Sequence, residues 1–315
     1  MKHRSISSLT SLSNLSNKGF TLIELVIVIT IAGIVAVLAA TMIGNQMLAY
    51  VDLTRRAQLT DQAETAVRQI TRDVRHAVPN SLRVTSNGGN QFMEFVPIRD
   101  AGRYRSLAGD GSFDDDDEVL DFSLEDTRFQ VLGRLPAVTA GDRLVIYNIG
   151  QVDGTGDPVN GANIYADPAD NPASSAVPVF DSHVITDASL ALSYSGTNNN
   201  VMNISGSGHQ FAFQSPQKRF YVVNQAVSFI CDMTNQTLWK YDGYDFESAQ
   251  ANSLSGSPLS GAAIKSTLIE NVTECDFQYN AGNAQRSGLL TITLTVSEDG
   301  ERARLVHQIH VDNAP

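Results

Sequence analysis

Basic residues are scarce in this chain. Its 315 residues include 22 Lys and Arg against 34 Asp and Glu, which gives a formal net charge of −12. Because Lys and Arg provide most of the affinity for phosphate backbones, this balance argues against nucleic-acid binding over a broad surface. The sequence also lacks a P-loop, a dinucleotide fingerprint and a nucleophile elbow. We therefore expect a non-enzymatic protein that needs no cofactor and binds no nucleic acid.

Charge is almost absent from one long stretch. From Phe20 to Ile43 the only charged residue is Glu24, and there is no proline. As a helix this stretch measures about 35 Å, enough to cross the roughly 30 Å hydrocarbon core of a bilayer. Residues 1–19 contain three Lys and Arg but no acid, which predicts a cytoplasmic N-terminus by the positive-inside rule. The sequence thus predicts a single membrane span with its C-terminal part outside the cytoplasm.

The carboxylate of Glu24 is the unusual feature of this stretch. An ionisable group inside a membrane is costly and is tolerated when it is paired. If the chain is cut after Gly19, the new amino group of Phe20 lies one helical turn from Glu24, within a subunit or between neighbours. Glu24 would then favour the docking position that neutralises the amine. The alternative is a plain signal anchor whose Glu24 side chain extends to the membrane surface.

Residues 19–24, GFTLIE, resemble the processing site of type IV prepilins and type II secretion pseudopilins. The resemblance implies that a prepilin peptidase removes residues 1–19 as a leader by cutting between Gly19 and Phe20. It also implies that Phe20 is N-methylated and that Glu24, at the fifth mature position, acts in assembly. Residues 20–43 would then form the transmembrane and assembly helix.

Beyond this helix the sequence pattern changes twice. Residues 44–78 are predicted to continue the helix as an amphipathic segment, because apolar residues recur at three- and four-residue steps. Residues 79–315 alternate short β-rich runs with Gly, Asn, Asp, Ser and Pro clusters, which is typical of antiparallel sheets. Predicted strands include 92–98, 119–123, 183–186, 219–223 and a hairpin of 290–296 with 304–311. We therefore predict an α+β, pilin-like fold in which a long N-terminal helix packs on an antiparallel β-sheet head.

Three groups of head residues are candidate sites. Cys231 and Cys275 are predicted to form a disulfide, because a compartment outside the cytoplasm is oxidising; the alternative is a pair of buried thiols. Trp239 and Tyr241 could stack on a ligand, although aromatic strand residues more often belong to a core. An acidic run is a candidate calcium site, although such runs are usually solvated turns. It consists of Asp114, Asp115, Asp116, Asp117 and Glu118.

Parts of the head carry a further resemblance. Residues 102–105, 141–148, 238–244 and 307–315 are similar to MshO-type minor pilins of mannose-sensitive haemagglutinin (MSHA) pilus biogenesis, and 61–80 to J-type minor pseudopilins. This implies a low-abundance pilin that primes or caps a type IV pilus used for surface attachment. Its partners would be other minor pilins, the major pilin, the prepilin peptidase and methyltransferase, and the inner-membrane assembly platform. The head would be periplasmic, or at the pilus tip after assembly. The alternatives are a type II secretion minor pseudopilin and a tip adhesin that binds a glycan or a surface.

Overall fold

The computed structural model describes residues 19–106, 119–166, 182–194, 200–260, 264–282 and 287–313, with the side chains of 44 and 45 excepted. The chain divides into two units, residues 1–54 and 55–315. Helix α1 (Leu22–Arg75) contributes to both of them.

In the first unit, α1 is apolar on all sides. Its large apolar side chains are exposed, from 43% for Val26 to 80% for Leu22. Among the described residues, α1 is the one helix whose length and composition suit a membrane span. The helix is unbroken through residues 41–44, and it begins two residues later than the predicted transmembrane segment.

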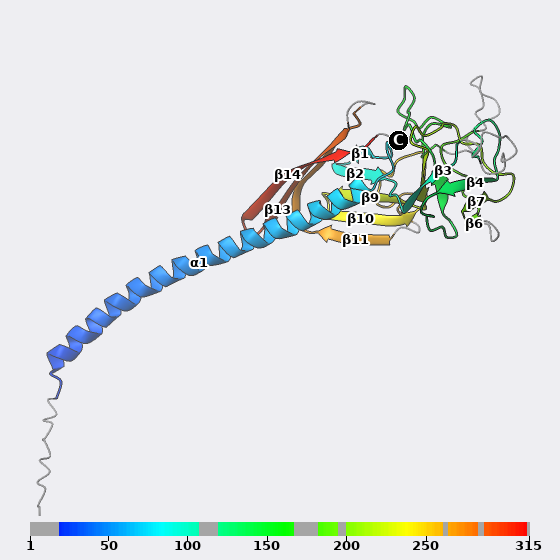
Figure 1. The fold of residues 1–315 in the computed structure, drawn as a ribbon. Helices are drawn as coiled ribbons and strands as arrows, with labels where there is room; N and C mark the ends of the chain where they lie inside the picture. The colour runs from blue at the N-terminus through cyan, green and yellow to red at the C-terminus, as the bar shows by residue number, and fades with distance from the viewer. Residues whose placement is uncertain are drawn as a thin grey trace, which may run out of the picture. The chain divides into compact units, whose positions relative to one another are not determined.

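The second unit contains three sheets in which every strand pair is antiparallel (Figure 1). The five-stranded sheet has the order β1 (Arg83–Asn87), β2 (Asn90–Phe95), β9 (Ala226–Asp232), β10 (Thr237–Tyr244) and β11 (Ile264–Ile269). The three-stranded sheet has the order β12 (Val272–Asn280), β13 (Gly288–Glu298) and β14 (Glu301–Val311). The six-stranded sheet has the order β5 (Arg143–Val145), β8 (Arg219–Val223), β3 (Asp100–Tyr104), β4 (Arg128–Leu132), β7 (Val201–Ile204) and β6 (Leu192–Tyr194).

The C-terminal part of α1 supplies the centre of the largest core. Leu59, Ala63, Val67, Ile70 and Val74 form one buried stripe at helical spacing. They belong to the same apolar cluster as buried side chains of the five-stranded and three-stranded sheets. Figure 1 shows these turns of α1 beside β9, β10 and β13. The amphipathic half of the helix therefore packs on the β-sheet head, and the predicted α+β fold class is confirmed.

The end of α1 is set by its last turn. The His76 N–H donates to the Asp73 carbonyl and the Ala77 N–H to the Val74 carbonyl, both at 3.1 Å. These three-residue spacings tighten the helix end, and Pro79 follows where the helix cannot continue. α1 accordingly ends at Arg75, three residues before the end of the predicted amphipathic segment.

The six-stranded sheet has a separate core. Tyr104, Phe129 and Phe220 are fully buried in it, and the last two rings meet edge to face with centroids 5.4 Å apart. Two predicted strands are wrong in this region. Residues 119–123 lie in a bend, and 183–186 form only isolated bridges, since their pairing with β5 is limited to two backbone hydrogen bonds, from the Ile146 N–H to Val184 and from the Thr186 N–H to Leu144.

Candidate functional site

The sequence-predicted processing bond lies at the start of the described chain. A Cβ atom built on Gly19 would have no neighbouring atom within 4 Å. The Phe20 side chain is 78% exposed, and both residues precede the first helical residue, Leu22. The bond between Gly19 and Phe20 is therefore exposed just before the helix begins, where a peptidase can reach it. The leader itself, residues 1–18, lies outside the described residues.

Thr21 caps the helix that follows. Its side-chain oxygen accepts a hydrogen bond from the Glu24 N–H at 3.3 Å, and its carbonyl accepts one from the Leu25 N–H at 3.1 Å. A threonine followed three residues later by glutamate is the signature of a capping box. This spacing is visible in the sequence, so a role for Thr21 could have been predicted from it.

Glu24 occupies the first turn of α1, where the helix dipole favours a negative charge. Its side chain is exposed, and none of the residues with described positions forms an ion pair with it. The carboxylate is thus placed on the surface of an apolar helix with its charge available. An amine from Phe20 or from another subunit could neutralise it there.

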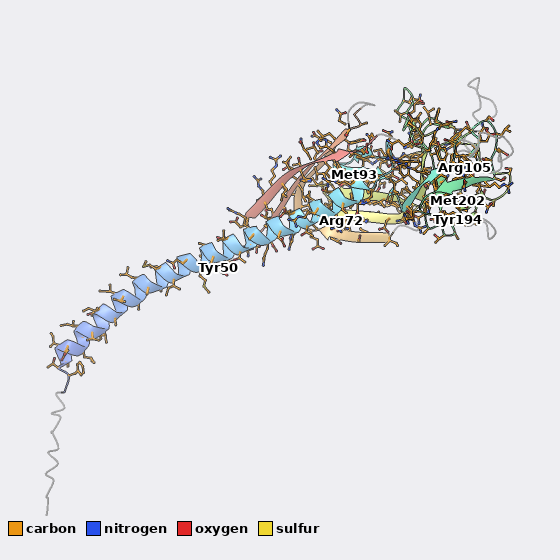
Figure 2. All side chains as sticks on the ribbon, viewed as in Figure 1. Tyr50, Arg72, Met93, Arg105, Tyr194 and Met202 are labelled. Carbon is orange, nitrogen blue, oxygen red and sulfur yellow. A yellow bond between two sulfur atoms is a disulfide. The ribbon has the colours of Figure 1, made fainter. Side chains whose placement is uncertain are left out.

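The apolar surface around Glu24 is continuous along the first unit. Large side chains such as Ile27, Ile31 and Leu38 are each more than 49% exposed, and the aromatic ring of Tyr50 projects from the helix (Figure 2). Soluble monomers seldom expose contiguous apolar surface on this scale, and larger patches mark membrane or protein contacts. The helix surface therefore suits lipid, other apolar helices, or both.

The two cysteines form a disulfide in the second unit. Cys231 on β9 is bonded to Cys275 on β12, with their Cα atoms 5.8 Å apart. Both residues are buried in the core beneath α1. The bond joins the five-stranded sheet to the three-stranded sheet, which share no strand pair. Its role is to hold these two sheets together around the helix.

The two aromatic residues proposed as ligand-binding candidates, Trp239 and Tyr241, are already in contact with other side chains of the protein. The Trp239 indole N–H is 3.4 Å from an Asp232 carboxylate oxygen, and the Lys265 ammonium lies 3.5 Å from the centre of the Trp239 rings. Tyr241 is only 4% exposed. This arrangement favours a structural role for both rings, with the lysine in the place that a stacked ligand would need.

The acidic run Asp114, Asp115, Asp116, Asp117 and Glu118 lies outside the described residues. Within the described ranges, no group of three or more His, Cys, Asp or Glu side chains could hold a metal ion. The calcium site stays a prediction.

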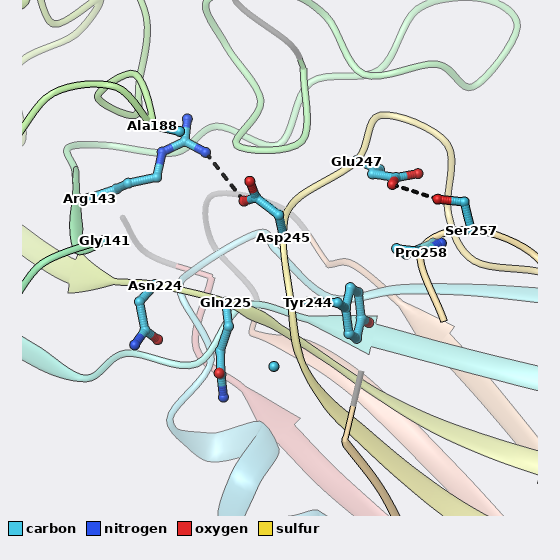
Figure 3. A pocket seen from close by; sticks show the side chains of 11 residues that line it. Gly141, Arg143, Ala188, Asn224, Gln225, Tyr244, Asp245, Glu247, Ser257 and Pro258 are labelled. Carbon is cyan, nitrogen blue, oxygen red and sulfur yellow. Dashed lines mark hydrogen bonds and ion pairs between the residues drawn. The ribbon is translucent and has the colours of Figure 1, made fainter. Parts of the chain in front are cut away.

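A polar cavity of about 540 Å³ opens between β5 and the segment after β10. The Arg143 guanidinium lies 3.7 Å from the Asp245 carboxylate, and the Ser257 hydroxyl donates to Glu247 at 3.0 Å; both contacts are drawn in Figure 3. Asn224 lines the opposite wall. The cavity offers donors and acceptors to a small polar molecule.

A buried ion pair lies near this cavity. The Arg83 guanidinium contacts Glu94 at 2.9 Å, donates to the carbonyls of Glu247 and Ser248 at 2.7 Å, and stacks 3.6 Å from the Tyr165 ring centre. Burial raises the pKa of Glu94 above its ordinary value, against the opposing effect of Arg83. Each of the three guanidinium nitrogens thus contacts a fixed partner, which ties the segment after β10 to β1 and β2. This network was not predicted from the sequence, because its members are separated by up to 165 residues.

One comparison with known proteins gives a match, and it covers the N-terminus. Residues 14–40 match the family described as the prokaryotic N-terminal methylation motif. Neither the curated proteins nor the solved structures include a match to this chain. The matched residues contain the accessible bond, the helix cap and Glu24. The chain thus carries a type IV prepilin-like methylation motif on a helix suited to membrane anchoring, which supports a structural, non-enzymatic protein of the pilin and pseudopilin type.

Proposed function

We propose that this protein is a minor subunit of a type IV pilus, of the kind used in MSHA pilus biogenesis, and that it primes or caps the filament. One observation carries the proposal: the methylation motif stands at the start of a helix whose first half exposes apolar side chains on all sides. Such a helix requires a membrane before assembly and apolar helices of other subunits afterwards.

The proposed sequence of events follows from the first turn of α1. The helix inserts in the inner membrane with residues 1–19 in the cytoplasm and the head in the periplasm. The prepilin peptidase hydrolyses the bond between Gly19 and Phe20 and then methylates the Phe20 amine. Glu24 pairs with an amine in the assembly, because an unpaired carboxylate among apolar helices is costly. Apolar contacts between helices have no preferred direction, so this one charge pair sets the position of each helix relative to its neighbours.

The size of the head supports a minor role. The second unit spans 261 residues, from 55 to 315, and everything in it beyond the end of α1 belongs to a head with three sheets. A head of this bulk suits a filament end better than every position of a helical array. The partners would be other minor pilins, the major pilin and the inner-membrane assembly platform.

Complementation of a deletion strain tests this function. We expect wild-type chain to restore surface filaments, Gly19→Ala to fail at processing, and Glu24→Val to be processed but to fail in assembly. Glu24→Asp is the matched control, because it keeps the charge. The wild-type chain should occur at far lower copy number than the major subunit in sheared filaments.

Two other results would redirect the proposal. Loss of protein secretion with filaments intact would identify a type II secretion pseudopilin. Intact filaments that no longer attach would identify a tip adhesin. Equal abundance of this chain and the major subunit would contradict the minor role.

A further inference from the structure

The edge of the three-stranded sheet is a long strand with one neighbour. The order β12-β13-β14 leaves β14, which has 11 residues, without a partner on its outer side among the described residues. Natural sheets usually shorten, cover or charge such edges, because a row of unpaired backbone groups is a template for another strand.

The hairpin turn determines which backbone groups face this edge. Asp299 and Gly300 form a two-residue turn with φ values of 47° and 88°, as in a type I′ hairpin. Glu298 and Glu301 then form the first hydrogen-bonded pair of the ladder, and every second pair after it is also bonded. On β14, the residues of the pairs that are not hydrogen-bonded direct their backbone N–H and C=O groups away from β13. On β14 they are Arg302, Arg304, Val306, Gln308 and His310.

Hydrogen bonds on the far side of β13 agree with this alternation. Ser297 and Thr295 lie opposite Arg302 and Arg304. The Ser297 N–H donates to the Asn271 carbonyl at 2.9 Å, and the Thr295 carbonyl accepts from the Thr273 hydroxyl at 3.4 Å. Because both groups of β13 point toward β12, the backbones of Arg302 and Arg304 point toward the open edge.

The side chains of the five edge-facing residues are all exposed. Val306, at the middle of the strand, is 60% exposed. The opposite face of the same strand carries the buried apolar side chains of Ala303, Ile309 and Val311, and its other members are half-buried: Glu301, Leu305 and His307. A strand added here would extend both the hydrogen-bond ladder and the apolar face.

The charge of the edge selects the partner. Arg302 and Arg304 stand two residues apart on the exposed face, in a protein whose net charge is −12. Arg304 is already 3.3 Å from Glu274, which shows that this row accommodates carboxylates across strands. An incoming strand with arginines at the matching positions would be repelled by Arg302 and Arg304. The edge therefore favours a strand with acidic residues there.

We infer that the β14 edge docks an extended segment of a neighbouring, different subunit of the same assembly. The side chains of this docked segment alternate between two faces. Acidic residues lie beside Arg302 and Arg304, and apolar residues lie on the face toward the core. This inference rests on the proposed function for the nature of the neighbour. The strand pairing supplies direction and register that the apolar helix surface lacks.

A photoreactive residue tests the inference in the full-length chain in cells. Val306→p-benzoylphenylalanine should form an adduct, after irradiation, with an acidic extended segment of another processed pilin-class subunit, identified by peptide sequencing. The same replacement at Leu124, which is 65% exposed in the irregular segment before β4, is the control for random contact.

Backbone variants separate strand pairing from other contacts. Gln308→Pro removes an edge-facing N–H without removing a bond to β13, as edge strands tolerate. We expect it to keep the thermal midpoint of the head and to lower the adduct yield about tenfold, the factor for one lost hydrogen bond of ordinary strength. Gln308→Ala should leave the yield unchanged. Arg302→Glu with Arg304→Glu should abolish the adduct.

The inference is overturned by a Val306 adduct at the level of the Leu124 control, by a yield that Gln308→Pro leaves unchanged, or by a second copy of this chain as the adduct. The N-terminus of the same sample separates the two proposals. A processed chain without the adduct contradicts the docking edge alone, whereas a retained leader contradicts the proposed function whatever the adduct shows.

Discussion

Removal of the disulfide should weaken the head by an amount that its position allows us to estimate. Cys231 and Cys275 are 44 residues apart in sequence. In the chain-entropy description, a cross-link that closes a loop of this length stabilises the folded state by about 4 kcal/mol. Replacing both residues by alanine should therefore lower the free energy of unfolding by about that amount. For a unit of this size the thermal midpoint should fall by roughly 8–16 °C.

Urea unfolding of the full-length chain in detergent, followed by tryptophan fluorescence, measures this change. Trp239 is the only tryptophan and lies on the strand next to Cys231, so its signal reports the five-stranded sheet. Wild-type chain unfolded under reducing conditions should match the double alanine variant, which controls for the side-chain replacement. A loss below about 1 kcal/mol would refute the reasoning, because it would mean that the sheets are held together without the bond.

Three further perturbations have expected outcomes. Ile70→Ala removes a fully buried side chain between α1 and the sheets and should cost about 2–5 kcal/mol by urea unfolding. Arg56→Ala breaks an exposed ion pair with Glu301 and should cost at most about 1 kcal/mol, a difference that high salt removes. Because burial raises the pKa of Glu94 above 4.5, its ionisation opposes folding, and stability should be lost as pH rises from that value through the raised pKa. Unfolding titrations between acid and neutral pH should show this loss in the wild type, and Glu94→Gln should remove it; an unchanged slope would contradict the assignment.

The long helix and the last hairpin were predictable from the sequence because their signals are local. The apolar run and the stripe through Leu59 and Val74 each follow one period, and Asp299-Gly300 between alternating residues is a strong hairpin signal. The predicted strand 219–223 has the bounds of β8, whose residues are nearly all apolar.

The division of the head into three sheets was not predictable in this way. Which strands pair depends on contacts between residues far apart in sequence, as between β2 and β9 or β3 and β8. Short strands such as β3 and β7 carry too few apolar positions for their pattern to be distinguished from a loop. Residues 183–186 are buried, but their backbone pairing with β5 is limited to one bridge and two hydrogen bonds, which is too short for a strand.

The residues of the candidate site also differ in whether they could be predicted from the sequence. Gly19, Phe20 and Glu24 could be predicted as site residues because the motif places them within six consecutive residues; their roles stay predictions. The Arg83–Glu94 pair and the open edge of β14 were not found, since each is created by the arrangement of strands.

The central claim is that this chain is a processed pilin-class subunit, and the mass of its mature N-terminus tests this claim most directly. The protein would be isolated from cells with and without the prepilin peptidase, as wild type and as Gly19→Ala. We predict a wild-type chain that begins at Phe20 and is heavier by one N-terminal methyl group, only when the peptidase is present. Gly19→Ala should keep its leader in both strains. A wild-type chain that retains residues 1–19 in the presence of the peptidase would contradict the account.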